Sequence, residues 1–202
     1  MKKILLASKS IDRSNLLDHA GISFEIFVSN IDEEKYKKLF PNPIDLVKEL
    51  AKAKTLFVKK KIENELEAII IGADTIVELD GEIIGKPHNE KDAFNILRKL
   101  MGKAHKLITG MAISETNNPK IIVDLDTTIV EFIQLSDMEI INYIKTNEWK
   151  GRAGAYSIMD RASLFIKKIE GSSSNVIGLP MHKLFEILKS EFNQNLFITT
   201  KS

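Results

Sequence analysis

Apolar positions are densest between Ile69 and Val77, the most apolar run of the chain, which is rich in β-branched residues. Such a run predicts a strand buried on both faces of a sheet. Asp74 lies within this run. An ionised carboxylate is costly there unless it is hydrogen-bonded, paired with a cation or bound to a metal. Asp74 therefore either caps a turn at the end of the strand or belongs to a functional site.

The other apolar patterns predict strands and helices along most of the chain. Further strands are expected at 3–7, 24–28, 105–114, 121–132 and 164–169, and helices at about 11–20, 43–61, 90–101, 137–144 and 181–188. The acidic run 32–34 and the polar run 171–175 are interpreted as loops, and the chain from Phe192 onward as a frayed end.

Residues 77–84 predict a β-hairpin, because an Asp80-Gly81 turn separates two short alternating segments. After the chain reverses, Lys86 returns near the level of Asp74. Lys86 then either brings a cation toward this carboxylate or is a surface lysine in a turn.

The long helix that Asn42 and Pro43 open carries a lysine in its apolar stripe. Lys54 is four residues from both Leu50 and Val58, so it lies on the face expected to be buried. A lysine there can extend its ammonium to water along the apolar surface. Because buried charges are seldom unpaired, the interpretation we favour is that Lys54 reaches an anion.

Two further segments combine polar or small residues with predicted core elements. Ser8 and Arg13 lie in the turn and first helical turn after the first strand, where an anion is favoured at a helix N-terminus. The alternative is that Ser10 or Asp12 caps the helix and Arg13 is solvated. The glycine-rich stretch 149–159 needs a close approach of the backbone, either to a ligand or to an element that packs against Tyr156.

Composition excludes several classes of protein. The 202 residues are 44% hydrophobic with a net charge of +1, so no overall field favours nucleic acid or a membrane surface as partner. The absence of cysteine excludes disulfides and thiolate chemistry, and the four histidines lack the spacing of metal ligands. With no signal peptide and no stretch of about 18 apolar residues, the expected location is cytoplasmic.

The charged residues next to core elements suit one kind of ligand. Two carboxylates can hold Mg²⁺ and position or deprotonate water, while cations neutralise phosphate charge, so the set predicts a polyphosphate site. Its members are Ser8, Arg13, Glu33, Lys54, Asp74 and Lys86. Neither the P-loop pattern nor the G-x-G-x-x-G pattern of dinucleotide-binding folds occurs in the chain.

The order of these motifs resembles the Maf family of nucleoside triphosphate pyrophosphatases from Ile4 to about Leu188. The matching segments are 6–10 with Arg13 and 16–17, 32–33, 50–51 with Lys54, 72–75, 85–87, 109–110, 153–156 and 176–180. The resemblance implies an α/β fold with an elongated mixed β-sheet, flanking helices and two lobes around a central cleft. It implies one such domain over residues 1–190, a tail over 191–202, and a homodimer.

The resemblance also implies a reaction and a role for each residue. Asp74 would accept the proton of the water that attacks the α-phosphate, yielding monophosphate and pyrophosphate. Glu33 and Asp74 would hold a divalent cation, Mg²⁺ or Mn²⁺. The triphosphate would be bound by Ser8, Arg13, Lys54 and Lys86, of which both lysines would also serve catalysis.

Three positions bear on the choice of base. The family branch that acts on dTTP and UTP has paired arginines after the serine motif, and here the first is Asp12. That branch has glutamine where this chain has Met159, whereas Thr75 is retained. A methionine cannot donate the hydrogen bonds of an amide. The substrate preferred by this chain can therefore carry a different or a modified base. The alternative function is a nucleotide-binding regulator of cell division and septum formation that acts through partners.

Overall fold

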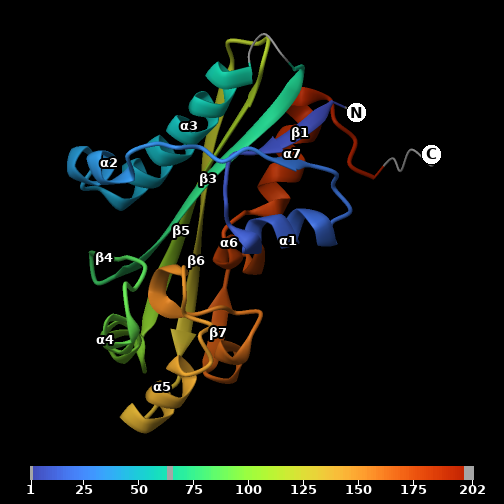
Figure 1. Ribbon diagram of the computed structural model, residues 1–202. Coiled ribbons are helices and arrows are strands. Elements are labelled where there is room, and N and C mark those ends of the chain that lie inside the picture. The colour runs from blue at the N-terminus through green and yellow to red at the C-terminus, as the bar shows by residue number, and fades with distance from the viewer. Residues whose placement is uncertain (1, 63–65, 198–202) are drawn as a thin grey trace. The chain divides into compact units, whose positions relative to one another are not determined.

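The structure is a computed structural model that describes residues 2–62 and 66–197 (Figure 1). Its strands are β1 (Lys3–Leu6), β2 (Glu25–Ile26), β3 (Ala68–Leu79), β4 (Glu82–Ile84), β5 (Ala104–Glu115), β6 (Ile121–Phe132) and β7 (Ile166–Glu170). Its α-helices are α1 (Ile11–His19), α2 (Glu33–Leu39), α3 (Pro43–Ile62), α4 (Glu90–Leu100), α5 (Asp137–Ile144), α6 (Ser173–Ile177) and α7 (Met181–Phe192). Two 3₁₀ turns are η1 (Ala153–Ala155) and η2 (Arg161–Leu164).

The strands form one mixed sheet, which confirms the predicted α/β class. Its order is β2-β1-β3-β5-β6-β7, with β4 paired to β3. β1 is parallel to β2 and to β3, with Leu5 opposite Ile70, whereas β4 is antiparallel to β3 and β7 to β6. The predicted Asp80-Gly81 turn is present, with φ of 52° and 87° at its two residues, as a tight hairpin requires.

Contacts between Cα atoms divide the chain into two compact units. Unit 1 comprises residues 1–74, 110–125 and 178–202, and unit 2 comprises 75–109 and 126–177. Strands β3, β5 and β6 contribute residues to both units. The cleft that the family resemblance implies stays a prediction.

Unit 1 buries both faces of its part of β3. Ile69, Ile71 and Ala73 pack with α1 and α7, while Ala68 and Ile70 pack with Val58 and Ile62 of α3. Because side chains alternate along a strand, these two sets lie on opposite faces of the sheet. Asp74 follows the same alternation as Ala68 and Ile70, so its side chain lies on the sheet face toward α3, the helix beside this part of β3 in Figure 1.

Unit 2 has a core rich in aromatic rings. Helices α4 and α5 pack with Val77, Leu79 and Leu107 of the sheet. Tyr156 is 5% exposed and stacks edge-on against Phe132, with 4.8 Å between ring centroids. Of the two interpretations of the stretch 149–159, the structure supports the packing of Tyr156 against neighbouring elements.

Some predicted element bounds were wrong. The run 32–34 begins α2 instead of a loop, residues 173–177 form α6, and the strand at 24–28 contains only Glu25 and Ile26. Phe192 ends α7 and is 7% exposed, and Gln194 accepts a hydrogen bond from the backbone N–H of Lys2. The chain is therefore not frayed from Phe192; residues 198–202 of the predicted tail lie outside the described range.

None of the helices in the described part of the chain is long and apolar enough to cross a membrane.

Candidate functional site

Two glycines bring α3 directly against the sheet backbone. A Cβ at Gly72 on β3 would lie 2.3 Å from Thr55 Oγ1 and 2.6 Å from the carbonyl oxygen of Ala51. A Cβ at Gly110 on β5 would lie 2.3 Å from the carbonyl oxygen of Val47. No other residue type fits these positions without moving the helix. The close approach brings the side chain of Lys54 on α3 within reach of β3.

Lys54 joins two carboxylates. Its Nζ lies 2.6 Å from Asp74 Oδ1 and 2.8 Å from Glu33 Oε1. The side chains of Lys54 and Asp74 are 10% and 13% exposed, whereas that of Glu33, at the start of α2, is 49% exposed. The prediction that Lys54 reaches an anion is therefore confirmed, and Asp74 is compensated by a cation rather than by a turn.

Ser8 and Arg13 are held together at the end of β1. Ser8 Oγ accepts hydrogen bonds from the backbone N–H of Ser10 at 3.2 Å and from Arg13 Nη1 at 2.9 Å. Because both lone pairs of this hydroxyl are engaged, it can act toward a further partner only as a donor. Ser10, as predicted for the capping alternative, accepts from the backbone N–H of Arg13 at the start of α1.

Arg13 is buried rather than solvated, with 8% of its surface exposed. Its Nε donates to the carbonyl oxygen of Gly178 at 2.7 Å. Burial lowers the pKa of Arg13 below its ordinary value, and the negative charges of Asp74, Glu33 and Asp12 oppose that shift. The guanidinium is thus in the field of the same carboxylates that bind Lys54.

The carboxylates of unit 1 fit a divalent cation. Glu33 and Asp74 converge on one ammonium group, so their oxygens already hold a positive charge between them. Mg²⁺ favours oxygen ligands and is usually held by one or two carboxylates together with substrate phosphates. Within the described residues no three His, Asp or Glu side chains gather into a ready-made metal cluster. The arrangement therefore suits a cation that shares its ligands with a substrate.

Three other predicted site residues lie in unit 2, and Asp12 lies in the first turn of α1. Lys86 follows β4 and is exposed, and Met159 is 64% exposed. Thr75 Oγ1 lies 2.9 Å from Thr109 Oγ1. The roles of these residues stay predictions, as do those of Ser8, Arg13, Glu33, Lys54 and Asp74.

A buried chain of hydrogen bonds supports Thr75. Thr109 donates its hydroxyl to the carbonyl oxygen of Asn175 at 3.1 Å, so the hydrogen between Thr75 and Thr109 comes from Thr75. The side-chain amide of Asn175 donates to Thr128 Oγ1 and to the carbonyl oxygen of Leu107. No sequence pattern pointed to a role for Asn175 or for the carbonyl of Gly178. Gly178 lies in a segment that resembles a family motif, and Asn175 adjoins that segment.

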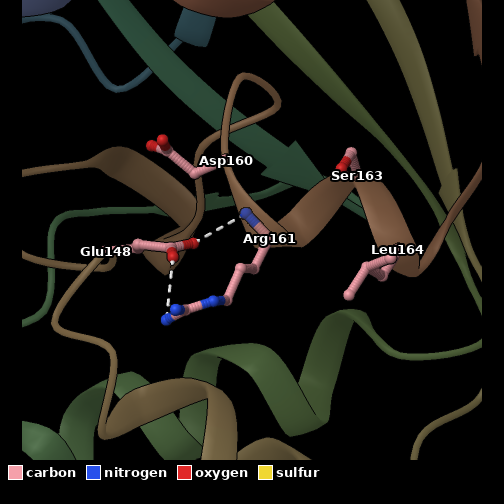
Figure 2. A pocket seen from close by; sticks show the side chains of 5 residues that line it. All are labelled: Glu148, Asp160, Arg161, Ser163 and Leu164. Carbon is pink, nitrogen blue, oxygen red and sulfur yellow. Dashed lines mark hydrogen bonds and ion pairs between the residues drawn. The ribbon is translucent and has the colours of Figure 1, made fainter.

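A surface hollow of about 410 Å³ lies elsewhere, in unit 2 (Figure 2). It is lined by Glu148, Asp160, Arg161, Ser163 and Leu164, and contains none of the predicted site residues. Figure 2 shows the side chain of Arg161 turned toward Glu148, with 3.5 Å between Arg161 Nη1 and Glu148 Oε1. Glu148 and Arg161 are thus paired with each other, and Asp160 Oδ2 lies 3.5 Å from Arg152 Nη2.

Comparisons with known proteins point to one family. The family model described as Maf-like protein matches residues 3–191. A dTTP/UTP pyrophosphatase of Thermoanaerobacter sp. (strain X514) is 43% identical over 194 residues, covering 96% of this chain and 99% of that protein. Proteins of the same name from Alkaliphilus oremlandii (strain OhILAs) and Dictyoglomus thermophilum (strain ATCC 35947 / DSM 3960 / H-6-12) are each 44% identical. They cover 97% and 93% of this chain, and the matches span 100% and 95% of those proteins.

Among solved structures, a nucleoside-triphosphatase / dITP/XTP pyrophosphatase from Mycobacterium abscessus ATCC 19977 / DSM 44196 aligns at 12% identity with a TM-score of 0.31. This alignment covers 64% of the chain and 72% of that protein.

Proposed function

Because the chain belongs to the family of Maf-like proteins, we propose that it is a nucleoside triphosphate pyrophosphatase, a hydrolase that splits the bond between the α- and β-phosphates. The observation that carries the proposal is the cluster of Glu33, Lys54 and Asp74 in unit 1. Buried Arg13 lies in the field of the two carboxylates. The names of the relatives support a triphosphate as substrate.

In the proposed reaction Asp74 accepts the proton of the attacking water. In the ligand-free structure Asp74 Oδ1 is bonded to Lys54. A carboxylate oxygen of Asp74 is the acceptor assigned to that proton. A bond forms between the water oxygen and the α-phosphorus while the bond from this phosphorus to the bridging oxygen breaks. The electron pair of the broken bond leaves with pyrophosphate, and the monophosphate keeps the oxygen of the water.

The other residues bind and orient the triphosphate. The hydroxyl hydrogen of Ser8 donates to a phosphate oxygen, and Arg13, Lys54 and Lys86 neutralise phosphate charge. Two hydrogen bonds from Arg13 to its own chain, to Ser8 and to Gly178, fix the plane of the guanidinium before substrate arrives. Positioning and neutralisation of this kind supply most of the rate in phosphoryl transfer.

Glu33 and Asp74 are the residues proposed to hold Mg²⁺ or Mn²⁺. When bound, such a cation neutralises charge that develops on the phosphate oxygens. The fit rests on the convergence of the two carboxylates on one ammonium group.

For the base, dTTP and UTP are the first candidates, because proteins that share 43–44% of their residues with this chain carry those nucleotides in their names. Thr75, Asp12 and Met159 are the proposed specificity positions. Exposed Met159 offers no amide, so we expect weaker discrimination between bases than a glutamine would give. A homodimer remains part of the proposal on the family resemblance alone. The regulator of cell division is not favoured, because the relatives carry the names of enzymes.

Product analysis tests the proposal. The protein is incubated with Mg²⁺ and a panel of nucleoside triphosphates that includes dTTP, UTP, CTP and modified pyrimidines, in water enriched in ¹⁸O. The expected products are pyrophosphate and a monophosphate that carries the label, as attack at the α-phosphorus requires. Release of inorganic phosphate, label in the pyrophosphate, or inactivity across the panel would each contradict the proposal.

A further inference from the structure

The ammonium of Lys54 lies between the two carboxylates proposed to hold the metal. Its Nζ is within 2.8 Å of Asp74 Oδ1 and of Glu33 Oε1, so a divalent cation that binds these two oxygens has to displace it. We propose that Lys54 competes with the metal for Glu33 and Asp74, and that the metal therefore binds together with the triphosphate and not to the nucleotide-free protein. The inference rests on the proposed function for the identity of the nucleotide, but not for the competition.

The charges of the nucleotide-free site are nearly balanced. Glu33, Asp74 and Asp12 carry three negative charges, and Lys54 and Arg13 carry two positive ones, so a divalent cation that entered alone would turn the sum from −1 to +1. Asp74 and Lys54 are both largely shielded from water, with 13% and 10% of their side chains exposed. A divalent cation that entered alone would leave an excess of positive charge in a poorly solvated place, which is unfavourable.

A triphosphate removes this obstacle. It brings several negative charges, so the ammonium of Lys54 gains phosphate oxygens as new partners when it leaves the carboxylates. The four-carbon stem of lysine is flexible enough for such an exchange, and its three donors have no fixed plane to maintain. The two carboxylates are then available to the cation that the phosphates also bind, which is the usual arrangement for Mg²⁺.

Lys59 provides a matched control on the same helix. Lys59 also projects from α3, but its Nζ donates to neutral oxygens: to Ser114 Oγ at 3.1 Å, and also to the carbonyl oxygen of Asn118. Substitution of Lys59 removes one lysine charge from the same helix without freeing a carboxylate. This variant therefore shows how much of any change in Mn²⁺ affinity comes from the loss of one positive charge and how much from the removal of the ammonium that competes for the carboxylates.

The test measures Mn²⁺ binding to the nucleotide-free protein by electron paramagnetic resonance of free Mn²⁺. Lys54→Met should bind Mn²⁺ about tenfold or more tightly than the wild type, because the competing ammonium is gone. Lys59→Met and Lys54→Arg, which keeps a charge at the site, should bind it as weakly as the wild type. Lys54→Gln replaces Lys54→Met if that variant does not fold.

A second measurement tests directly whether the metal and the triphosphate bind together. Calorimetry of a triphosphate analogue with a methylene group between the α- and β-phosphorus should show tighter binding to the wild type when Mn²⁺ is present. Equal Mn²⁺ affinity of the wild type and Lys54→Met, or tight Mn²⁺ binding by the nucleotide-free wild type, would overturn the inference. Pyrophosphate release by the wild type is assayed in parallel. Absence of this activity would contradict the proposed function, whereas the Mn²⁺ affinities alone decide whether Lys54 competes with the metal.

Discussion

The hydroxyl of Thr109 connects the proposed specificity residue Thr75 to the buried backbone of α6. Thr109 and Asn175 are both fully buried, so the carbonyl oxygen of Asn175 has no access to water that could replace the donor supplied by Thr109. A buried acceptor that loses its donor carries its full desolvation cost.

Thr109→Val is therefore expected to lower the free energy of unfolding by about 1–3 kcal/mol, because valine keeps the shape of threonine but cannot donate. Thr109→Ser keeps the hydroxyl and should cost less than Thr109→Val. Urea titration followed by circular dichroism measures both. Equal losses for the two variants would show that the methyl group matters and not the hydrogen bond.

His105 gives unit 2 a defined dependence on pH. It is 2% exposed, its Nε2 lies 2.9 Å from the hydroxyl oxygen of Tyr156, and burial lowers its pKa from 6.5 to about 4. Between these two pH values the unfolded chain binds a proton that the folded chain does not. Stability should therefore fall as pH drops from about 6.5 to about 4, by about 3 kcal/mol at most from this residue.

The comparison of wild type with His105→Gln isolates this effect, since glutamine does not titrate and its amide can still bond to Tyr156. Unfolding free energies are measured for both proteins at pH 7, 6, 5 and 4. The wild type should lose more stability than His105→Gln as the pH falls, so that the two curves converge or cross. Parallel curves for the two proteins would mean that His105 does not supply the difference.

Sequence analysis at the residue scale succeeded where a side chain broke a pattern. Lys54 interrupts an apolar stripe and Asp74 interrupts an apolar strand, so each required a partner, and each is the other's partner in the structure. The carbonyl oxygen of Gly178, which fixes Arg13, left no such signal, because every residue carries a main-chain acceptor.

At the scale of elements, the site depends on how closely α3 approaches the sheet. Gly72 and Gly110 each face the backbone of α3 at distances that a methyl group could not occupy. The register between α3 and β3 that these glycines allow is what sets Lys54 beside Asp74.

Gly72→Ala and Gly110→Ala should each destabilise the protein by about 1–3 kcal/mol, the usual cost of overpacking, and should lower pyrophosphatase activity by moving Lys54. Gly85→Ala is the matched control for stability, because a Cβ there would have none of the described residues within 4 Å apart from its two chain neighbours. Thermal unfolding and initial rates measure the two effects. Full stability of Gly72→Ala would contradict the close packing.

Elements with strong local signals were predicted, and short ones were not. The β3–β4 hairpin and helices α3, α4 and α5 follow from turn residues, caps and periodicity. Helix α2 has no buried residue and α6 has five residues, so neither carries an apolar stripe that a sequence pattern could reveal.

At the scale of the whole molecule, the chain returns repeatedly from one unit to the other. Residues of unit 1 come from three separate stretches, and those that form the charged cluster, Glu33, Lys54 and Asp74, come from the first of them. The mixed sheet was expected from the family resemblance; hydrophobic periodicity alone gives no strand order, because it records burial and not the identity of neighbours. The tertiary pairing of α3 with β3 decides which charges meet.

The measurement that tests the central claim most directly compares Asp74→Asn with Asp124→Asn in a pyrophosphate-release assay. Both aspartates are ion-paired to a lysine within unit 1, Asp74 to Lys54 and Asp124 to Lys183 at 3.1 Å, but only Asp74 is proposed to take the proton of water. Asp74→Asn should lower kcat by about a hundredfold or more, as loss of a general base does, while Asp124→Asn stays near the wild-type rate. Full activity of Asp74→Asn with dTTP or UTP would contradict the assignment of Asp74 as the base.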